Sequence, residues 1–229
     1  MPRRRPIVRH VIVGGASVCA VLLIVALTEL STEDWGRPDQ LKRDGLLWQF
    51  NVATGTVAAA LLVVTLSIRP LRTLRGRTTP AHLPWRRATG VWSAVLVVAH
   101  IPGGLAIHSS GWRVWTPFES VVPGIDGRPL DEFTVGYWVG LVAALTLVPL
   151  LLTSTNESLR RRGAANWKRL HRLVYVTYAL AAVHVVALQY GESRDLRHVA
   201  LTALVFGAAI VVRAVAVVSS RRGGRAVPP

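Results

Sequence analysis

Two histidines lie in the middle of long apolar stretches of the chain: His100 in Val-Val-Ala-His-Ile and His184 in Ala-Val-His-Val-Val. Ionisable side chains are costly inside a bilayer unless they are paired, so such residues are candidates for function. His100 follows Arg87 by 13 residues, and His184 follows Arg172 by 12. With the rise of an α-helix, both histidines then lie about 18–20 Å from the bases that begin their stretches.

Two neutral imidazoles at matched depth on different helices form the ligand set of a six-coordinate haem, with one imidazole on each side of the macrocycle. The chain has a single cysteine, Cys19, and no C-x-x-C-H sequence for covalent attachment. The haem would therefore be of the b type, and a Cys-ligated metal centre is excluded. Cys19 is interpreted as a small core residue of the first apolar stretch. The alternative for the two histidines is that each only hydrogen-bonds a neighbouring helix.

The spacing does not favour a second pair of haem ligands nearer the basic residues. His171 precedes His184 by 13 residues, which on an ideal helix is a rotation of roughly 220°. The position fourteen residues before His100 is Arg86, which is not a haem ligand, and His82 is the nearest substitute. His171 is alternatively an interfacial residue, or it binds a flavin, a quinone head group or a haem propionate together with nearby bases. Those bases are Arg86, Arg87, Lys168 and Arg169.

Other residues near the apolar stretches have simpler interpretations. Pro102 is expected to bend its helix beside His100, because it cannot donate a helical hydrogen bond. The following Gly103 and Gly104 would either admit a planar ring close to the backbone or allow tight helix packing. Trp92 is expected to pack in the core rather than on a cofactor. Three further histidines are expected at the membrane interface: His10, His108 and His198.

The elements that must position these histidines are membrane-spanning helices. The 229 residues are 51% hydrophobic and 17% charged, which is too apolar for an ordinary soluble domain. A helix needs roughly 20 apolar residues to cross a bilayer, and six stretches of that length occur. They run approximately from Val11 to Leu30, Leu47 to Ile68, Ala88 to His108, Phe133 to Thr153, Leu173 to Tyr190 and Val199 to Ser219. The prediction is an all-α integral membrane bundle of six helices.

The charges between the stretches alternate by loop, which predicts the orientation. One side has twenty bases against a single acid, Glu157, and the other has seven bases against eleven acids. Because Lys and Arg accumulate on the cytoplasmic side, both termini are predicted to be cytoplasmic in a multi-pass plasma membrane protein. The net charge of +15 is thereby explained without nucleic acid. Residues 1–10 are predicted as a basic N-terminus, 11–219 as the six-span domain and 220–229 as a tail.

Three motifs in this order resemble those of the ferric reductase-like transmembrane domain. The resemblance covers roughly residues 47–190. The matching residues are Arg86-Arg87-x-x-Gly90-x-Trp92 followed by His100, then Thr153-Ser154-Thr155, then Trp167-x-x-Leu170-His171-x-x-Val174-Tyr175 followed by His184. Within that superfamily, the chain is most similar to the haem-binding membrane subunits of periplasmic methionine sulfoxide reductase systems.

The resemblance implies a six-helix b-type cytochrome, the electron-transfer subunit of an oxidoreductase. It would pass electrons from quinol or a cytoplasmic flavin reductase to an extracytoplasmic partner, a molybdopterin-containing methionine sulfoxide reductase. The positions that match the family's histidines are His100, His171 and His184, and a further family histidine is replaced here by Arg86. FMN or a quinone at the cytoplasmic side is also implied.

Two other functions are consistent with the residues. In one of them, the protein binds haem and passes electrons to ferric or cupric ions. The other is a non-redox permease or interaction subunit whose buried histidines only connect helices. The bases expected to contact haem propionates or an anionic electron donor are Arg86, Arg87 and Arg169, and membrane topology alone is the competing explanation for them.

Overall fold

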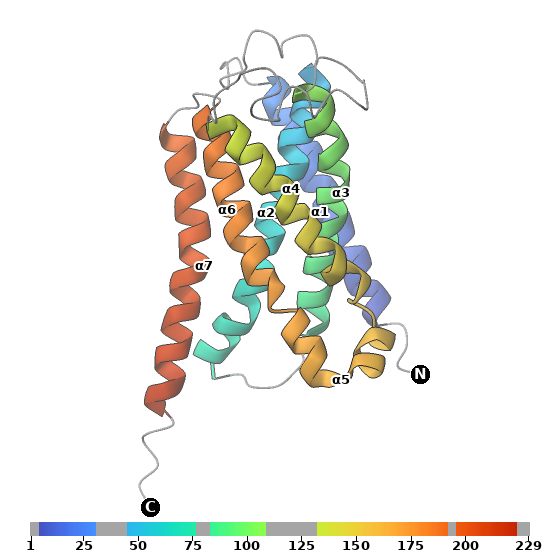
Figure 1. Ribbon diagram of the computed structural model, residues 1–229, viewed down its shortest axis with the longest axis vertical. Helices are drawn as coiled ribbons and strands as arrows, with labels where there is room; N and C mark the ends of the chain where they lie inside the picture. Colours follow the sequence, from blue (N-terminus) through green and yellow to red (C-terminus); the bar gives the residue numbers. More distant parts are fainter. Residues whose placement is uncertain (1–4, 31–44, 77–82, 109–131, 192–195, 224–229) are drawn as a thin grey trace, which may run out of the picture.

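The computed structural model describes residues 5–30, 45–76, 83–108, 132–191 and 196–223, and every regular element within these ranges is a helix. The helices are α1 (Arg5–Leu30), α2 (Gly45–Leu74), α3 (Leu83–His108), α4 (Glu132–Leu152), α5 (Asn156–Leu170), α6 (Leu173–Gly191) and α7 (Leu196–Gly223). Figure 1 shows the long helices side by side and α5 lying across one end of the bundle.

Six of these helices are long and apolar enough to cross a membrane, which confirms the predicted all-α membrane bundle. Their limits differ from the prediction mainly at the charged ends. α1 begins at Arg5, so Arg9 and His10 belong to the helix, and α2 continues through Arg69 and Pro70 to Leu74. A helix does not have to end where its apolar residues end, because long basic side chains reach back to the interface.

α5 was not predicted, and it lies in what the sequence suggested was a loop. It is strongly polar, so a search for long apolar stretches passes over it. Thr155 caps its N-terminus by accepting a hydrogen bond from the Ser158 amide, and Glu157 pairs with Arg160 and Arg161 on the next turn. Gly163 has a φ of 72° and kinks the helix, a conformation that only glycine adopts readily.

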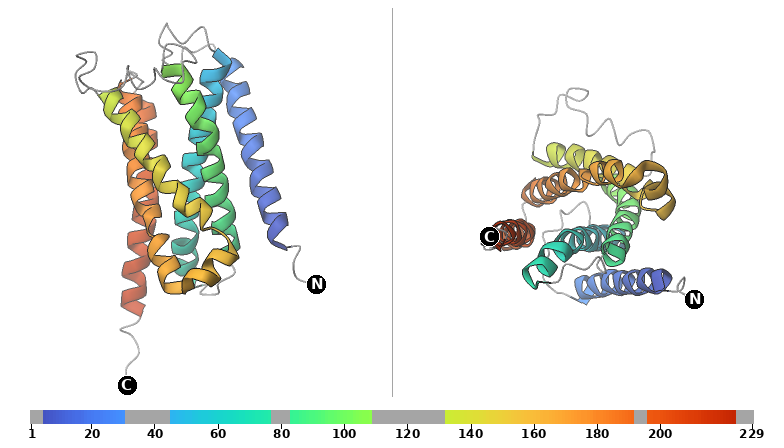
Figure 2. Two further views of the ribbon diagram at one scale, coloured as in Figure 1. Left: turned by 45° about the vertical axis from the view of Figure 1, so that its right-hand side comes forward. Right: turned by 90° about the horizontal axis from the view of Figure 1, so that it is seen from below.

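The helices pack as two antiparallel pairs. α2 packs most extensively against α3, and α4 against α6. α1 lies on the outside of the first pair, while α7 bridges α2 and α6, as the view from below in Figure 2 shows. One buried cluster joins α1, α2 and α3 through Val21, Val57 and Leu96. A second cluster joins α2, α6 and α7 through Leu66, Tyr178, Phe206 and their neighbours.

Small and polar side chains connect each pair of helices. In the first pair, Ser93 donates to the Ala58 carbonyl at 2.8 Å and Thr65 donates to the Thr89 hydroxyl at 2.7 Å. In the second, the hydroxyls of Thr146 and Thr177 lie 2.7 Å apart. Such contacts hold helices together in a membrane, where burial of apolar surface gives no driving force.

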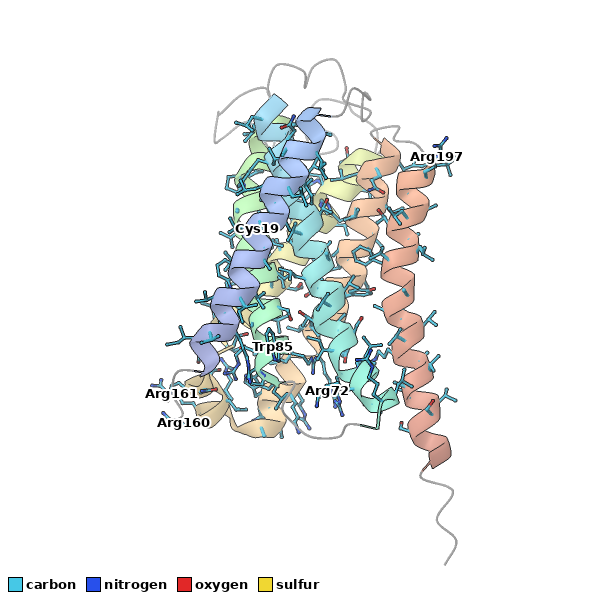
Figure 3. The ribbon with its side chains drawn as sticks, turned by 180° about the vertical axis from the view of Figure 1, so that it is seen from behind. Cys19, Arg72, Trp85, Arg160, Arg161 and Arg197 are labelled. Atoms are coloured by element: carbon cyan, nitrogen blue, oxygen red, sulfur yellow. The ribbon has the colours of Figure 1, made fainter. Side chains whose placement is uncertain are left out.

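The surface of the bundle is apolar over most of its height. Leu22, Leu145 and Leu201 are more than half exposed, as expected for residues that face lipid. Cys19 is also exposed on α1, which corrects its interpretation as a core residue (Figure 3). α1 begins and α7 ends at the end of the bundle where α5 lies (Figure 1). Because most of the arginines are also found there, we call it the basic end.

Candidate functional site

The structure brings the rings of His100 and His184 together, edge to face, between the two helix pairs. His100 projects from α3 and His184 from α6, and their ring centroids are 6.2 Å apart with planes inclined at 83°. The two helices belong to different pairs and contact each other little. Two residues 84 positions apart in the chain are thereby brought together across the two helix pairs.

Each imidazole is held by a backbone carbonyl of its partner helix. His100 Nδ1 lies 2.9 Å from the carbonyl oxygen of Asn51 on α2, and His184 Nδ1 lies 2.8 Å from that of Gly136 on α4. A carbonyl oxygen only accepts, so each Nδ1 carries the hydrogen and each Nε2 carries the lone pair. This is the arrangement of metal-binding histidines, in which the second ring nitrogen donates to a carbonyl that fixes the tautomer and the ring orientation.

A glycine lies under each ring, one helical turn beyond the residue that supplies the carbonyl. A Cβ atom at Gly140 would be 2.3 Å from His184 Nδ1, and one at Gly55 would be 2.9 Å from His100 Cε1. Residues four apart lie on the same helix face. Asn51 and Gly55 on α2 therefore make the same arrangement as Gly136 and Gly140 on α4. In each pair the first residue supplies the carbonyl and the glycine leaves room for the imidazole ring, and we call this arrangement a seat.

The spacing of the rings fits a metal bound between them. Two bonds from imidazole nitrogens to a metal of about 2 Å each, added to a distance of about 1 Å from each nitrogen to its ring centroid, give a separation of about 6 Å. The structure has 6.2 Å. Within the described ranges no group of three or more His, Cys, Asp or Glu side chains is placed to hold a metal ion. Two histidine ligands suit a haem, which supplies four nitrogen ligands of its own.

The hydrogen bonds of His100 and His184 are also those expected if the histidines only connect helices. The distinguishing features are the short distance of 6.2 Å between the two rings and the glycine that makes room for each of them. Two independent helix contacts would not require the histidines to meet across the bundle. The predicted role of His100 and His184 as haem ligands rests on these features.

His171 lies elsewhere, near the basic end and outside the membrane-spanning part of α6. Its ring stacks on Trp167 with centroids 3.8 Å apart, and its Nε2 lies 3.2 Å from the Thr153 hydroxyl. Trp167 in turn donates to the Thr153 carbonyl at 2.9 Å. Burial lowers the pKa of His171, the contact with Thr153 opposes this, and the positive charges of Arg87 and Arg86 lower the pKa further.

Of the three arginines predicted to contact an anion, two are placed beside His171. Arg86 is half-buried and donates through Nε to the Thr65 carbonyl at 3.1 Å, and Arg87 donates to the Asn156 side chain. Their charges reach His171. Arg169 and Lys168 are exposed residues of α5.

Trp92 and Gly103, which the sequence also singled out, both lie at contacts between helices. Trp92 donates to the His10 carbonyl at 2.9 Å and packs on Gly14, so it anchors α1 and its prediction as a core residue fits. Gly103 lies against Asn51, where a Cβ would be 2.9 Å from Oδ1, so it serves helix packing. His82 and the side chains of His108 and His198 lie outside the described residues.

Sequence reasoning missed the residues that seat the imidazoles: Asn51, Gly55, Gly136 and Gly140. A carbonyl carries no side-chain signal, so Asn51 and Gly136 could not be recognised. The Gly136-x-x-x-Gly140 spacing is the one available sign, since small residues four apart allow another helix to approach closely.

Comparison with known proteins places the chain in a family. The family model described as "Ferric reductase like transmembrane component" matches residues 54–182, a range that includes His100, Gly136 and Gly140 but ends before His184. No solved structure matches the chain.

Curated relatives match more than half of the chain. The chain is 35% identical over 131 residues, 57% of its length, to the protein-methionine-sulfoxide reductase heme-binding subunit MsrQ of Deinococcus radiodurans, and covers 58% of that protein. It is 36% identical over 143 residues, 62% of its length, to MsrQ of Xanthomonas campestris pv. campestris, and covers 59% of it.

A third relative is much longer. The magnetosome protein MamZ of Magnetospirillum gryphiswaldense is 31% identical over 158 residues, which are 69% of this chain but only 21% of that protein. The chain thus spans less than two thirds of the length of each of these relatives.

Proposed function

We propose, from the premise that this chain belongs to the ferric reductase like transmembrane family, that it is a b-type cytochrome that carries electrons across the membrane. His100 and His184 would hold one haem between the two helix pairs. The observation that supports the proposal best is the pair of facing imidazoles, each with its Nδ1 bonded to a carbonyl and its ring seated on a glycine. The names of the MsrQ relatives, heme-binding subunits, agree with it.

Haem supplies the one-electron chemistry when it is bound, and the protein contributes position, ligation and environment. The carbonyls of Asn51 and Gly136 keep both Nε2 atoms unprotonated, so no proton has to leave when a metal binds. Two histidine ligands leave no open position for substrate, which favours electron transfer over oxygen chemistry.

Electrons would enter at the basic end and leave at the other. With the basic end at the cytoplasmic side of the plasma membrane, the donor would be quinol or a cytoplasmic flavin reductase. His171, Arg86 and Arg87 lie together at this end, where they suit the head group of a quinone or the anionic part of FMN. The acceptor would be an extracytoplasmic, molybdopterin-containing methionine sulfoxide reductase. The name of the MsrQ relatives supports a methionine sulfoxide reductase as the partner.

One haem per chain is the expected content. The position that would face His171 on α3 is Arg86, whose Nε is bonded to the Thr65 carbonyl. His171 already contacts Thr153 through Nε2, the nitrogen that would have to bind a metal. These contacts favour binding of an anion at the basic end over binding of a second haem.

The haem content of the purified protein tests the proposal. The wild-type protein should be red, with reduced-minus-oxidised absorption bands that disappear in His100→Ala and in His184→Ala. His10→Ala is the matched control, because this residue contributes its carbonyl to Trp92 and lies far from the pair along α1. A colourless wild-type protein without iron would leave a permease or an interaction subunit as the function.

Reduction of ferric or cupric ions is a second candidate, favoured by the description of the matching family model. It predicts that the isolated, prereduced protein reduces ferric or cupric chelates without any protein partner. If instead it reoxidises only with an extracytoplasmic reductase present, the role as an electron-transfer subunit is supported.

A further inference from the structure

We propose that the junction of α2, α6 and α7 at the basic end is a binding site for the phosphate of an anionic phospholipid. The site is formed by Arg69 of α2, Tyr175 of α6 and Arg213 of α7, with Arg86 of α3 behind them. It is separate from the histidine pair and does not depend on the proposed electron transfer.

Arg213 is a charged residue within the apolar span Val199–Ser220. Its guanidinium lies over the Tyr175 ring, 4.2 Å from the centroid, and donates to the Tyr175 hydroxyl. Tyr175 is two residues from the start of α6, so this contact sets Arg213 level with the ends of the other helices. A charge held inside a membrane span indicates a functional site by default, because placing it there is costly.

Arg213 is not an isolated charge. Arg86 lies close enough to feel the positive charges of both Arg69 and Arg213, as well as the Tyr175 hydroxyl. Arg213 thus lies on the Tyr175 ring, and Arg69 and Arg86 lie within reach of each other's charge at the same end of the buried cluster of α2, α6 and α7. Such a cluster is unfavourable in a low-dielectric environment unless an anion neutralises it.

In the described ranges, no carboxylate acts on Arg86, where the charges of this cluster meet. Glu157 is the one acid that the sequence has between the helix ends on the basic side. Its carboxylate is already shared by Arg160 and Arg161 of α5. The counter-charge therefore has to come from outside the chain.

A phospholipid suits the surroundings better than a soluble anion. Arg69 and Arg213 are exposed on the side of the bundle that would face lipid. Exposed apolar side chains flank them on the same two helices, namely Leu71, Leu74, Val211 and Val215. Guanidinium groups bind phosphate oxygens with strong charge-assisted hydrogen bonds, and the apolar residues offer a surface for the acyl chains. The buried cluster of Leu66, Tyr178 and Phe206 closes the site from within.

Thermal unfolding of the full chain in nanodiscs tests this site. Phosphatidylglycerol discs should raise the Tm above that in phosphatidylcholine discs, and native mass spectrometry should detect bound phosphatidylglycerol. Arg69→Gln with Arg213→Gln should abolish both effects. Each guanidinium near an anionic surface is expected to change lipid affinity about fivefold.

Arg75→Gln is the matched control, because Arg75 is an exposed base just beyond the end of α2. It should keep the difference between the two lipids. The proposal fails if both lipids give the same Tm, or if the double variant keeps the phosphatidylglycerol effect. It also fails if inorganic phosphate in neutral discs reproduces the stabilisation, because the site would then bind free phosphate. None of these readouts depends on haem.

Discussion

The same helices carry two very different polar layers. Around His100 and His184 the layer is neutral, and each imidazole is fixed by one carbonyl and one glycine. Near the basic end the layer contains Arg86, Arg87 and His171 with the hydroxyls of Thr65 and Thr153. The histidine layer suits a neutral metal ligand set, whereas the arginine layer suits an anion. Depth in the membrane explains the difference, because only the basic end has headgroups and water nearby to lower the cost of charge.

Substitution of the glycines under the imidazole rings should have the largest effect on haem binding. Gly140→Ala and Gly55→Ala would push the rings off their positions, and seat residues of this kind are expected to change metal affinity by about 10–100-fold. Gly140→Ala should be the more severe, because its Cβ would lie 2.3 Å from the ring against 2.9 Å for Gly55. Haem titration of the purified variants measures this.

Gly207→Ala is the control for the seats, since nothing lies within 4 Å of a Cβ there. If Gly140→Ala binds haem as tightly as Gly207→Ala, the glycine does not seat a ligand. If Gly140→Ala folds normally but shows no haem absorption bands, the substitution has removed the haem without disrupting the structure.

The two layers should respond differently to loss of a histidine. His171→Ala should retain the haem content of the wild type, because the pair on α3 and α6 remains intact. Its reduction by a quinol or a flavin donor should slow, while reduction by dithionite should be unchanged. A fall in haem from about two per chain to one would contradict the single-haem interpretation.

The arginine layer should also give a pH dependence. The pKa of His171 is lowered in the folded protein, mainly by burial, so the unfolded chain binds more protons. His171 contributes to stability above the pKa of about 6.5 that it has in the unfolded chain. This contribution is lost as the pH falls through its lower pKa in the folded protein. The Tm of the wild type should therefore fall more steeply than that of His171→Gln below neutral pH. If the Tm of the two proteins fell equally with pH, the lowered pKa of His171 would be contradicted.

The smallest effect is expected at α5, which lies outside the spans. Thr155→Ala removes the cap of the Ser158 amide and should cost about 1 kcal/mol of helix stability. Hydrogen exchange of the first turn of α5 should speed up while the Tm and the haem content stay nearly constant. A large fall in haem would mean that α5 supports the histidine layer directly.

Some features followed from residue types alone. Long runs without charge predicted six helices because a bilayer requires about 20 apolar residues for each. The matched depth of His100 and His184 followed from counting along α3 and α6. α5 could not be found in this way, because a polar helix at an interface has no apolar run to recognise, and its cap at Thr155 is a local signal that loops share.

What the amino-acid sequence determined by itself is the transmembrane architecture and the depth of each histidine, since both depend on hydropathy and helical rise along one chain direction. Only the tertiary structure decided that the two imidazoles meet, that carbonyls of α2 and α4 hold their Nδ1 atoms and that Gly55 and Gly140 make room for the rings. It likewise decided that Arg213 of α7 lies on the Tyr175 ring of α6 and that its charge reaches Arg86 of α3. The physical reason is that rotation and pairing of helices depend on contacts between residues far apart in the chain, which no local pattern encodes.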